Sequence, residues 1–425
     1  MEQWKEYKAT DFCTNVTDGT HDSPKAKEKG HFLITSKHLQ NNAIDFSSAY
    51  RIADDDYLKV IQRSKVEQYD ILFSMIGTIG NTVRVVSPEV DFAVKNMAIF
   101  KMGRNDLKSK WLYYWLKSST AKAYISSRLA GSTQSYLTLD ALRNFPIYAP
   151  DERTMKKITD ILSSIDDKIE LNNRINHNLE EQAQALYKSW FVDFEPFKDR
   201  KFVDSELGMI PEGWHVGHIK ELISDTYNGD WGKEDATGAF IKRVFCIRGA
   251  DIPSIRVGDS GKMPTRFIQE KHYLSKFLMN DDIVVEISGG SPTQSTGRFC
   301  RITEELVKRY DNSLICTNFC KALRPKAGCS LYIAYLWNDL YDRGIMFSYE
   351  NGTTGIKNLD LAGLISGESV IIPDQKSIQA FSSIVSSLNQ QVLFNGHENE
   401  KLANQRDTIL PKLMSGDVLF NSLTC

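Results

Sequence analysis

The sequence predicts an α+β fold of two mixed α/β globular units separated by two long helices, and three observations lead to this prediction. With 425 residues, the chain exceeds the size of one ordinary domain. Two segments that open at Pro150 and Pro373 align without gaps at a shift of 223 residues. The region before each segment alternates short β-branched runs with turn residues, which is typical of strands. The predicted order is therefore globular, helix, globular, helix.

The first globular unit is expected over residues 1–150. The run 70–80 is β-branched and ends in glycines, which predicts a strand followed by a turn. The apolar stretch 111–116 predicts a helix, and the segment 131–140 begins as a Gly-Ser-Thr turn.

The first long helix is expected within residues 151–200. From Ile158 to Trp190, apolar or core-type residues recur in steps of three and four, which indicates a heptad seam. Asp151 directly follows a proline and is a suitable N-cap. The seam also contains Asn172 and Asn176. A buried asparagine in a seam sacrifices stability for one register, so these two residues are predicted to fix how the helix pairs.

The second half repeats this pattern, with a globular unit predicted over residues 201–372 and a helix followed by a C-terminal tail over residues 373–425. The seam asparagines recur as Asn395 and Asn399. Two helices of about 40 residues would each span roughly 60 Å, which makes a rod of fixed length. The alternative is an ordinary helical hairpin inside one domain. The separation of the two helices by about 180 residues of different character favours the rod.

Composition limits the class of protein. The chain is 41% hydrophobic and 25% charged, and no stretch approaches the roughly 20 apolar residues of a membrane span. Its first residues lack a signal-peptide pattern, so we expect a cytoplasmic protein without a membrane partner. The net charge of -2 argues against nucleic-acid binding by bulk charge. The seven cysteines lack zinc-type spacing; Cys316 and Cys320 could share a metal, but reduced, buried thiols are favoured.

Motifs for catalysis are largely missing from the sequence. It contains neither a nucleotide-binding P-loop nor the tetrapeptide of amino-methyltransferases. Asp281, Asp282 and Glu286 could form a nuclease-type metal site, but the usual lysine after the glutamate is absent and a strand start with solvated acids is favoured. His21, between two aspartates, could perform acid–base chemistry, although a tight turn is the favoured interpretation. No metal site is expected.

Several motifs in a fixed order resemble a known family, the specificity (S) subunits of type I restriction-modification enzymes. The resemblance covers nearly the whole chain. The motifs lie at residues 18–24, 70–80, 145–150, 186–194, 208–214 and 410–416. The second half departs most from the pattern, because the Asp-Gly-Thr-His sequence at residues 18–21 has only the stretch 225–232 in its place.

The resemblance implies two target-recognition domains held apart by two helices that pack as an antiparallel coiled coil. It also implies that each domain reads one half of a split, asymmetric DNA target. The helices would set the spacing and dock two methyltransferase subunits, and restriction subunits with ATPase and nuclease activity would join them. The chain itself would be a non-catalytic subunit without cofactors, while S-adenosylmethionine, ATP and Mg would be bound by the partner subunits.

Base edges and phosphates are contacted by polar and basic side chains from turns and helix ends, so candidate DNA contacts are sought there. The first globular unit offers His21, Lys37, His38, Gln40, Thr78 and Gln134. The second offers Arg248, Thr265, Arg266, Gln294, Arg298 and Lys357. Two rival functions stay open at this point: a coiled-coil scaffold that binds only proteins, and a stand-alone nuclease.

Overall fold

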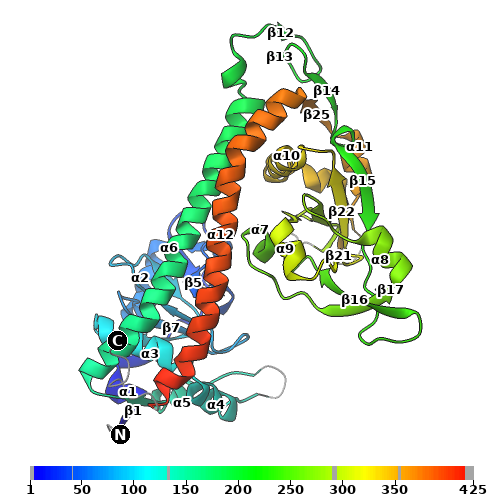
Figure 1. Ribbon diagram of the computed structural model, residues 1–425. Coiled ribbons are helices and arrows are strands. Elements are labelled where there is room, and N and C mark those ends of the chain that lie inside the picture. The colour runs from blue at the N-terminus through cyan, green and yellow to red at the C-terminus, as the bar shows by residue number, and fades with distance from the viewer. Residues whose placement is uncertain (1–3, 41, 132–134, 290–293, 353–355, 417–425) are drawn as a thin grey trace. The chain divides into compact units, whose positions relative to one another are not determined.

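The structure is a computed structural model of the chain (Figure 1). It describes residues 4–40, 42–131, 135–289, 294–352 and 356–416. The chain divides into two compact units. The first unit comprises residues 1–167 and 403–425, and the second unit comprises residues 168–402. Each unit thus combines a globular region with a part of each long helix.

The two long helices are α6 (Glu152–Phe191) and α12 (Gln375–Met414), each of 40 residues. Asp151 caps α6, because its carboxylate accepts hydrogen bonds from the backbone N–H groups of Arg153 and Thr154. Asp374 caps α12 in the same way and accepts from the backbone N–H of Ser377 at 2.8 Å. Both helices therefore begin where the aspartate after each proline predicts.

Inside the second unit the two helices run antiparallel, and their seam contains four asparagines. Asn172 donates to Asn399 Oδ1 at 2.9 Å, and Asn395 donates to Asn176 Oδ1 at 2.8 Å. The shift of 223 residues converts one pair into the other, so the two contacts are related by a local pseudo-twofold axis. Asn176 and Asn395 are each 4% exposed. Buried amides that pair in this way favour a single register.

In the first unit the other ends of the same helices meet at an ion pair. Arg406 Nη1 lies 2.6 Å from Asp166 Oδ1, and the Tyr114 hydroxyl donates to Asp166 Oδ2 at 2.8 Å. Arg406, a charged residue in the otherwise largely apolar seam of α12, therefore has an acid opposite it. The second unit replaces this arrangement by a neutral one, in which Asn389 donates to the Tyr335 hydroxyl at 2.7 Å.

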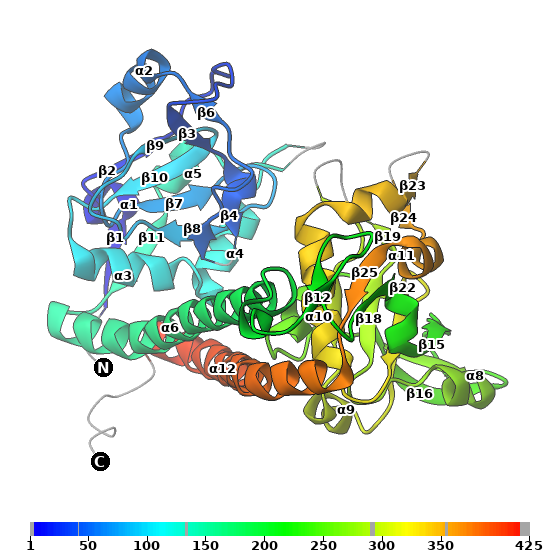
Figure 2. The same ribbon diagram turned by 90° about the horizontal axis from the view of Figure 1, so that it is seen from above.

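The first unit carries three sheets and a short β pair, whose main strands lie side by side in Figure 2. The strands are β1 (Lys5–Lys8), β2 (Asn15–Asp18), β3 (His31–Ile34), β4 (Leu39–Gln40), β5 (Ala43–Ile44), β6 (Arg51–Ile52), β7 (Ile71–Ser74), β8 (Thr82–Arg84), β9 (Phe92–Val94), β10 (Met97–Lys101) and β11 (Pro146–Ala149). The helices are α1 (Ala9–Phe12), η1 (Ser36–His38), α2 (Asp54–Ser64), α3 (Asp106–Trp115), α4 (Ser119–Ser127) and α5 (Leu139–Arg143).

The second unit is larger. Its strands are β12 (Phe202–Val203), β13 (Ile210–Pro211), β14 (His215–His218), β15 (Ile223–Asn228), β16 (Phe240–Ile247), β17 (Thr265–Gln269), β18 (Ile283–Glu286), β19 (Ser288–Gly289), β20 (Phe299–Arg301), β21 (Leu314–Cys316), β22 (Cys320–Pro325), β23 (Glu350–Gly352), β24 (Lys357–Leu359) and β25 (Ser369–Ile372). Its shorter helices are η2 (Glu195–Phe197), η3 (Ile219–Leu222), α7 (Ile252–Arg256), α8 (Glu270–Lys276), α9 (Glu304–Arg309), α10 (Ser330–Asp342), η4 (Ile345–Tyr349) and α11 (Leu361–Gly367).

The internal repeat extends to the order of the strands. The four-stranded sheet β2-β10-β7-β8 corresponds to β15-β22-β18-β20, and the three-stranded sheet β6-β3-β9 corresponds to β17-β16-β21. Both three-stranded sheets combine one antiparallel and one parallel pairing. The pair β1-β11 likewise corresponds to β14-β25. The two globular regions are therefore two versions of one framework.

Each framework is anchored to the helices within its own unit by a hydrophobic core. In the first unit, Leu162 of α6 and Leu413 of α12 pack with Trp111 of α3. In the second unit, the ring of Phe191 lies 4.8 Å from that of Tyr332 and 5.0 Å from that of Phe381, measured between centroids. Apolar side chains of the helices thus form part of both cores.

The predicted fold class is confirmed: mixed α and β units, two long helices that pack antiparallel, and a pseudo-twofold repeat. Among the described residues, no helix has the length and apolar character needed to cross a membrane.

Candidate nucleic-acid interface

Each unit brings two loops together at the same place in the repeated framework. In the first unit, the backbone N–H of Leu137 donates to Met75 O at 2.8 Å, which joins the loop after β7 to the segment before α5. In the second unit, Leu359 donates to Ile287 O, also at 2.8 Å. We call these two arrangements the loop pairs. The first pair has an exposed bend at Gly77 and Thr78, and the second pair joins the short strands β19 and β24, so both can present side chains to a partner.

In the first loop pair, Thr78 lies at an exposed turn. The Ser74 hydroxyl donates to Thr78 O at 2.5 Å, and Gly77 and Gly80 have φ angles of 78° and 98°, which glycine adopts readily. Asn81 of the same loop donates to Leu39 O at 2.9 Å, so the turn 36–40 is attached to the loop pair. Thr78 therefore lies near the turn with Lys37 and Gln40. The remaining candidate of this region, Gln134, lies outside the described residues.

The turn with Lys37 and Gln40 is supported by a buried histidine. The His38 side chain is 0% exposed, and its Nδ1 accepts from the backbone N–H of Thr35 at 2.9 Å. Burial lowers the pKa of His38, and the adjacent Lys37 cation lowers it further. In this conformation a neutral His38 shapes the turn and cannot reach a base edge. Lys37 and Gln40 are exposed, and Gln40 donates to Lys37 O at 2.9 Å.

The Asp-Gly-Thr-His segment does not form the predicted tight turn: it continues from β2 alongside residues 94–97, with a bridge between Thr20 and Lys95, and its histidine is exposed. His21 Nε2 lies 2.9 Å from Asp18, and its Nδ1 lies 2.9 Å from Asn96 Oδ1. Asp18 is also paired with Arg63 at 2.8 Å. A Cβ atom on Gly19 would lie 2.2 Å from Val94 O, so glycine is required there. These contacts favour the structural interpretation of the motif. The imidazole is still accessible, because the His21 side chain is 62% exposed.

The second unit contains an equivalent segment after β15 despite its different sequence, because the backbone N–H of Asp230 donates to Cys316 O. A Cβ atom on Gly229 would lie 1.9 Å from Thr317 O, just as Gly19 approaches Val94. Asp230 beside it is paired with His272 at 2.9 Å and with Lys276 at 3.2 Å. The stretch 225–232 thus takes the place of the Asp-Gly-Thr-His motif of the first half. Gly229 is the residue of this stretch from which the equivalence could have been recognised in the sequence.

Four of the basic candidates in the second unit have carboxylate partners. Arg248 pairs with Asp251, Arg266 with Glu234, Arg298 with Glu286, and Lys357 with Glu350. The hydrogen bonds that Arg298 donates to Glu286 raise the pKa of the guanidinium, and those from Arg248 to Asp251 do the same for Arg248. These cations therefore stay charged but are largely neutralised. Their partners were not foreseen from the sequence, because most lie on other elements.

The other candidates of the second unit lie at the edges of these elements. Thr265 is the first residue of β17 and is partly buried, while Gln294 is exposed in the segment between β19 and β20. Lys357 is part of the second loop pair, since it pairs with Gly289 across β24 and β19. Of these candidates, Lys357 lies in the second loop pair. Three others lie outside it, on or beside β16 and β17: Arg248, Thr265 and Arg266.

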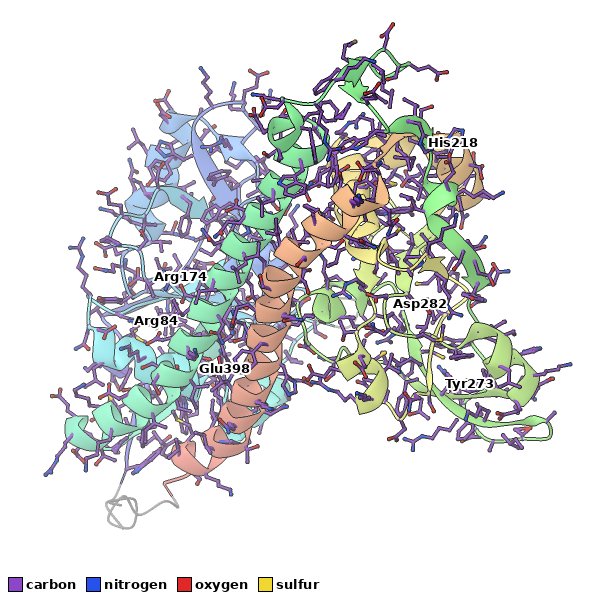
Figure 3. The ribbon with its side chains drawn as sticks, turned by 45° about the horizontal axis from the view of Figure 1, so that its top comes forward. Arg84, Arg174, His218, Tyr273, Asp282 and Glu398 are labelled. Carbon is purple, nitrogen blue, oxygen red and sulfur yellow. The ribbon has the colours of Figure 1, made fainter. Side chains whose placement is uncertain are left out.

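The three acids considered as a nuclease site do not share a cation. Asp281 pairs with Arg301, Asp282 with Arg324 and Glu286 with Arg298 (Asp282 is labelled in Figure 3). The described part of the chain contains no group of three or more His, Cys, Asp and Glu residues that could hold a metal ion. Asp282 is 1% exposed, and its two carboxylate oxygens accept hydrogen bonds from the Arg324 guanidinium at 2.9 Å. Its role is therefore structural, as one half of a buried ion pair.

Comparison with known proteins agrees with this arrangement. The family model described as the type I restriction modification DNA specificity domain matches residues 1–181. The MjaIX specificity subunit of Methanocaldococcus jannaschii is 29% identical over 332 residues, which cover 75% of this chain and 71% of that protein. The HindI specificity subunit of Haemophilus influenzae is 24% identical over 470 residues, which cover 98% of this chain and all of that protein.

A solved structure shares the fold. The S subunit of a type I restriction-modification system from M. genitalium has a TM-score of 0.50 and 16% sequence identity, with 96% of each chain covered. Its similarity supports the repeated framework with two long helices. Along nearly its whole length the chain is similar in sequence to type I restriction-modification specificity subunits, and it shares the fold of one of them.

Proposed function

We propose that the chain reads a split, asymmetric DNA sequence for a type I restriction-modification complex and carries out no catalysis itself. One observation carries the proposal: the same framework occurs twice, with equivalent loop pairs that differ in length and in side chains. The first pair presents Thr78, whereas the second presents Lys357 beside β19. Two unlike loop pairs on one framework suit two unlike half-sites.

The exposed candidates have the chemistry for such reading. Thr78 and Gln40 offer a hydroxyl and an amide to base edges, and Lys37 offers a cation to a phosphate. In the second unit, the guanidinium groups of Arg248 and Arg298 are held in a fixed orientation, because each donates two hydrogen bonds to one carboxylate. Arg248 keeps 39% of its side chain exposed, so it can still contact DNA.

The charge balance supports a shared DNA interface. With a net charge of -2 and several neutralised cations, the chain alone lacks a strong attraction for phosphates. We propose that partner methyltransferase subunits supply much of the missing positive charge. S-adenosylmethionine, ATP and Mg would act in the partner subunits, and the complex would work in the cytoplasm.

The long helices carry a candidate docking face for two copies of one partner. Leu171 of α6 is 43% exposed, and the shift of 223 residues places it on Phe394 of α12, which is 64% exposed; both lie in the second unit. Large apolar side chains left open at equivalent positions are typical of a binding surface. We propose that each helix receives one methyltransferase through these residues, and that restriction subunits join that core.

Co-expression with a methyltransferase of the same system tests the function. We expect adenine methylation at one split motif, mapped across a genome by single-molecule sequencing, and none when this chain is omitted. Methylation without the chain would refute the proposal and favour a protein scaffold. Metal-dependent cleavage by the pure chain would favour a nuclease.

Docking is tested separately with Leu171→Ser and Phe394→Ser. We expect each to remove one methyltransferase copy from the complex in native mass spectrometry, and both together to remove two. Leu207→Ser is the matched control, since Leu207 is 48% exposed but lies outside the helices. Equal losses with the control would contradict the proposed face.

A further inference from the structure

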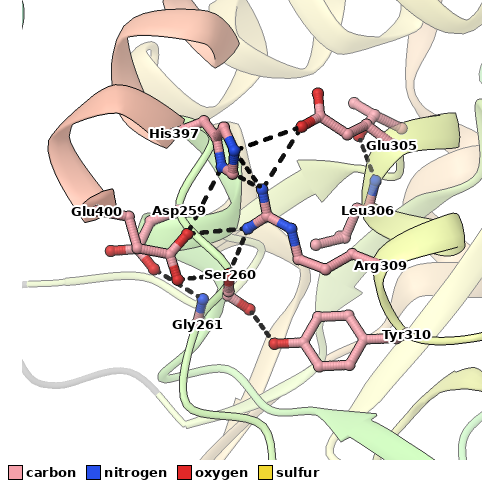
Figure 4. Close-up of polar contacts among 10 residues, drawn as sticks. Asp259, Ser260, Gly261, Glu305, Leu306, Arg309, Tyr310, His397 and Glu400 are labelled. Atoms are coloured by element: carbon pink, nitrogen blue, oxygen red, sulfur yellow. Dashed lines mark hydrogen bonds and ion pairs between the residues drawn. The ribbon is translucent and has the colours of Figure 1, made fainter. Parts of the chain in front are cut away.

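A polar cluster connects α9 to the middle of α12 within the second unit (Figure 4). Arg309 of α9 donates to Glu400 Oε2 at 2.9 Å and also bonds the imidazole of His397, both on α12. Ser260 completes the cluster, because its hydroxyl donates to Glu400 Oε1 at 2.6 Å and also accepts from Arg309. We call Ser260, Arg309, His397 and Glu400 the latch. The Arg309, His397 and Glu400 side chains are only 24 to 27% exposed, so water screens these charge-assisted contacts less than those of surface pairs.

The backbone beside the latch touches the helix directly. A Cβ atom on Gly396 would lie 1.6 Å from Val257 O, and one on Gly258 would lie 2.3 Å from Leu393 O. Glycine inside a helix is unfavourable by about 1 kcal/mol relative to alanine, so a helical Gly396 needs a structural reason. That reason is the approach of the 257–258 loop, which no side chain at position 396 would permit.

The latch is a second attachment, separate from the hydrophobic one at the start of α12. The first attachment is the aromatic core around Tyr332 and Phe381. Between the two attachments lies a cavity of about 510 Å³, lined by residues of α6, α7, α10 and α12. An ion pair of Arg256 and Glu180 crosses this region at 3.7 Å, but both side chains are more than a third exposed, so it contributes little. Without the latch, the globular region could tilt about the aromatic core into this space.

The latch departs from the internal repeat. Helix α9 lies between β20 and β21, whereas residues 85–91 between the corresponding strands β8 and β9 contain no helix. Gly396, His397 and Glu400 correspond to Asn173, Arg174 and His177 of α6. The second globular region has therefore acquired a specific connection to its own helix.

We propose that the latch fixes the spacing at which the second recognition domain reads DNA, and that Arg309, Glu400 and Gly396 are positioning residues for this property. The inference rests on the proposed function. One base pair changes the separation of two half-sites by roughly 3.4 Å and their relative rotation by about a tenth of a turn. A domain held at two points resists such a tilt, whereas a domain held at one point accommodates it.

Methylation mapping with the full complex tests the proposal. We expect the same change in three variants: Arg309→Ala, Glu400→Gln and Gly396→Ala. In each, the ratio of methylation at sites whose spacer is one base pair longer or shorter to methylation at sites with the normal spacer should rise about tenfold above the wild-type ratio. The bases of both half-sites should stay unchanged. Lys308→Ala is the matched control, because Lys308 lies on α9 and pairs with Glu304 in an exposed contact outside the latch. A variant that lowers methylation equally at all spacers would overturn the proposal and assign the latch a purely structural role.

A distance measurement on the full chain decides the mechanical part without DNA. Spin labels at Ile241→Cys on β16 and Gln390→Cys on α12, in a Cys425→Ser background, report tilting inside the second unit. Both positions are exposed, and the other six cysteines are buried. Arg309→Ala should broaden the distance distribution, and Lys308→Ala should not. An unchanged distribution would overturn the latch, whereas failure of the wild-type complex to methylate a split motif would overturn the proposed function.

Discussion

The amide of Asn395 donates to Asn176 Oδ1 at 2.8 Å, and the shift of 223 residues maps this contact onto the one between Asn172 and Asn399. Each helix thus contributes one partner to each contact. A one-turn slip of the helices would move all four amides against apolar or charged neighbours. The asparagines therefore choose the register of the two helices within the second unit, at some expense of stability.

Single replacements in this pair should be worse than a double replacement. Asn395→Leu leaves the buried Oδ1 of Asn176 without its donor and should lower the free energy of unfolding by about 1–3 kcal/mol. Asn176→Leu combined with Asn395→Leu removes both polar groups and should recover most of that loss. Urea unfolding of the four proteins in a double-mutant cycle measures this. Additive effects of the two replacements would contradict a direct contact.

The internal repeat offers a compensating change for the ion pair of Arg406 and Asp166. Arg406→Ala, which introduces the residue found at the equivalent Ala183, should lower stability by about 3 kcal/mol, because it leaves the partly buried Asp166 carboxylate without its ion-pair partner. Adding Asp166→Asn reproduces the two residues, Ala183 and Asn389, that stand at the equivalent positions of the second unit, and it should restore much of the loss. Calorimetry compares the two variants. If the double variant were no more stable than Arg406→Ala, the two sites would not be equivalent.

The N-cap of α12 predicts a pH dependence. Burial alone would raise the pKa of Asp374, but hydrogen bonds from Ser377, Trp214 and Arg200 outweigh it and lower the pKa to about 2. A carboxyl with a lowered pKa stabilises the fold above its usual pKa of 3.8 and loses this effect as the pH falls toward 2. Asp374→Ala should therefore lower the unfolding free energy by about 1 kcal/mol at pH 7, with a smaller difference from wild type below pH 4. A difference independent of pH would contradict this.

The two kinds of proposed DNA contact should respond differently to substitution. Lys37→Ala should weaken binding of the assembled complex on all sequences and reduce the slope of log K against log salt by about 1, as expected for a phosphate contact. Thr78→Ala should relax one position of one half-site and leave the slope unchanged. Lys157→Ala, an exposed lysine on α6, controls for the loss of charge. If Lys37→Ala relaxed the base preference instead, the assignment of Lys37 to a phosphate contact would be contradicted.

The sequence predicted the repeat and the long helices because their signals are local and periodic. A heptad seam and an aspartate after a proline decide where a helix lies and where it begins, as Asp151 and Asp374 illustrate. The seam also contained Arg406, whose partner Asp166 lies 240 residues away in sequence and could not be paired with it from a pattern.

The candidate site was less predictable because it depends on contacts between distant elements. His38 looked like a surface turn residue, yet the turn folds its ring inward. The carboxylate partners of Arg266 and Lys357 lie on other turns and strands. The glycines were better guides: Gly19 and Gly229 mark equivalent close approaches of two backbones in halves whose side chains differ. Close approach of two backbones leaves a trace in the sequence, whereas side-chain pairing does not.

The central claim is that each half of the chain reads one half of the DNA target. Exchanging residues 1–150 for the corresponding segment of another specificity subunit, followed by methylation mapping with the same methyltransferase, tests it most directly. We predict a motif in which one half-site changes while the other half-site and the spacer stay the same. A motif that changes in both halves, or in neither, would contradict the claim.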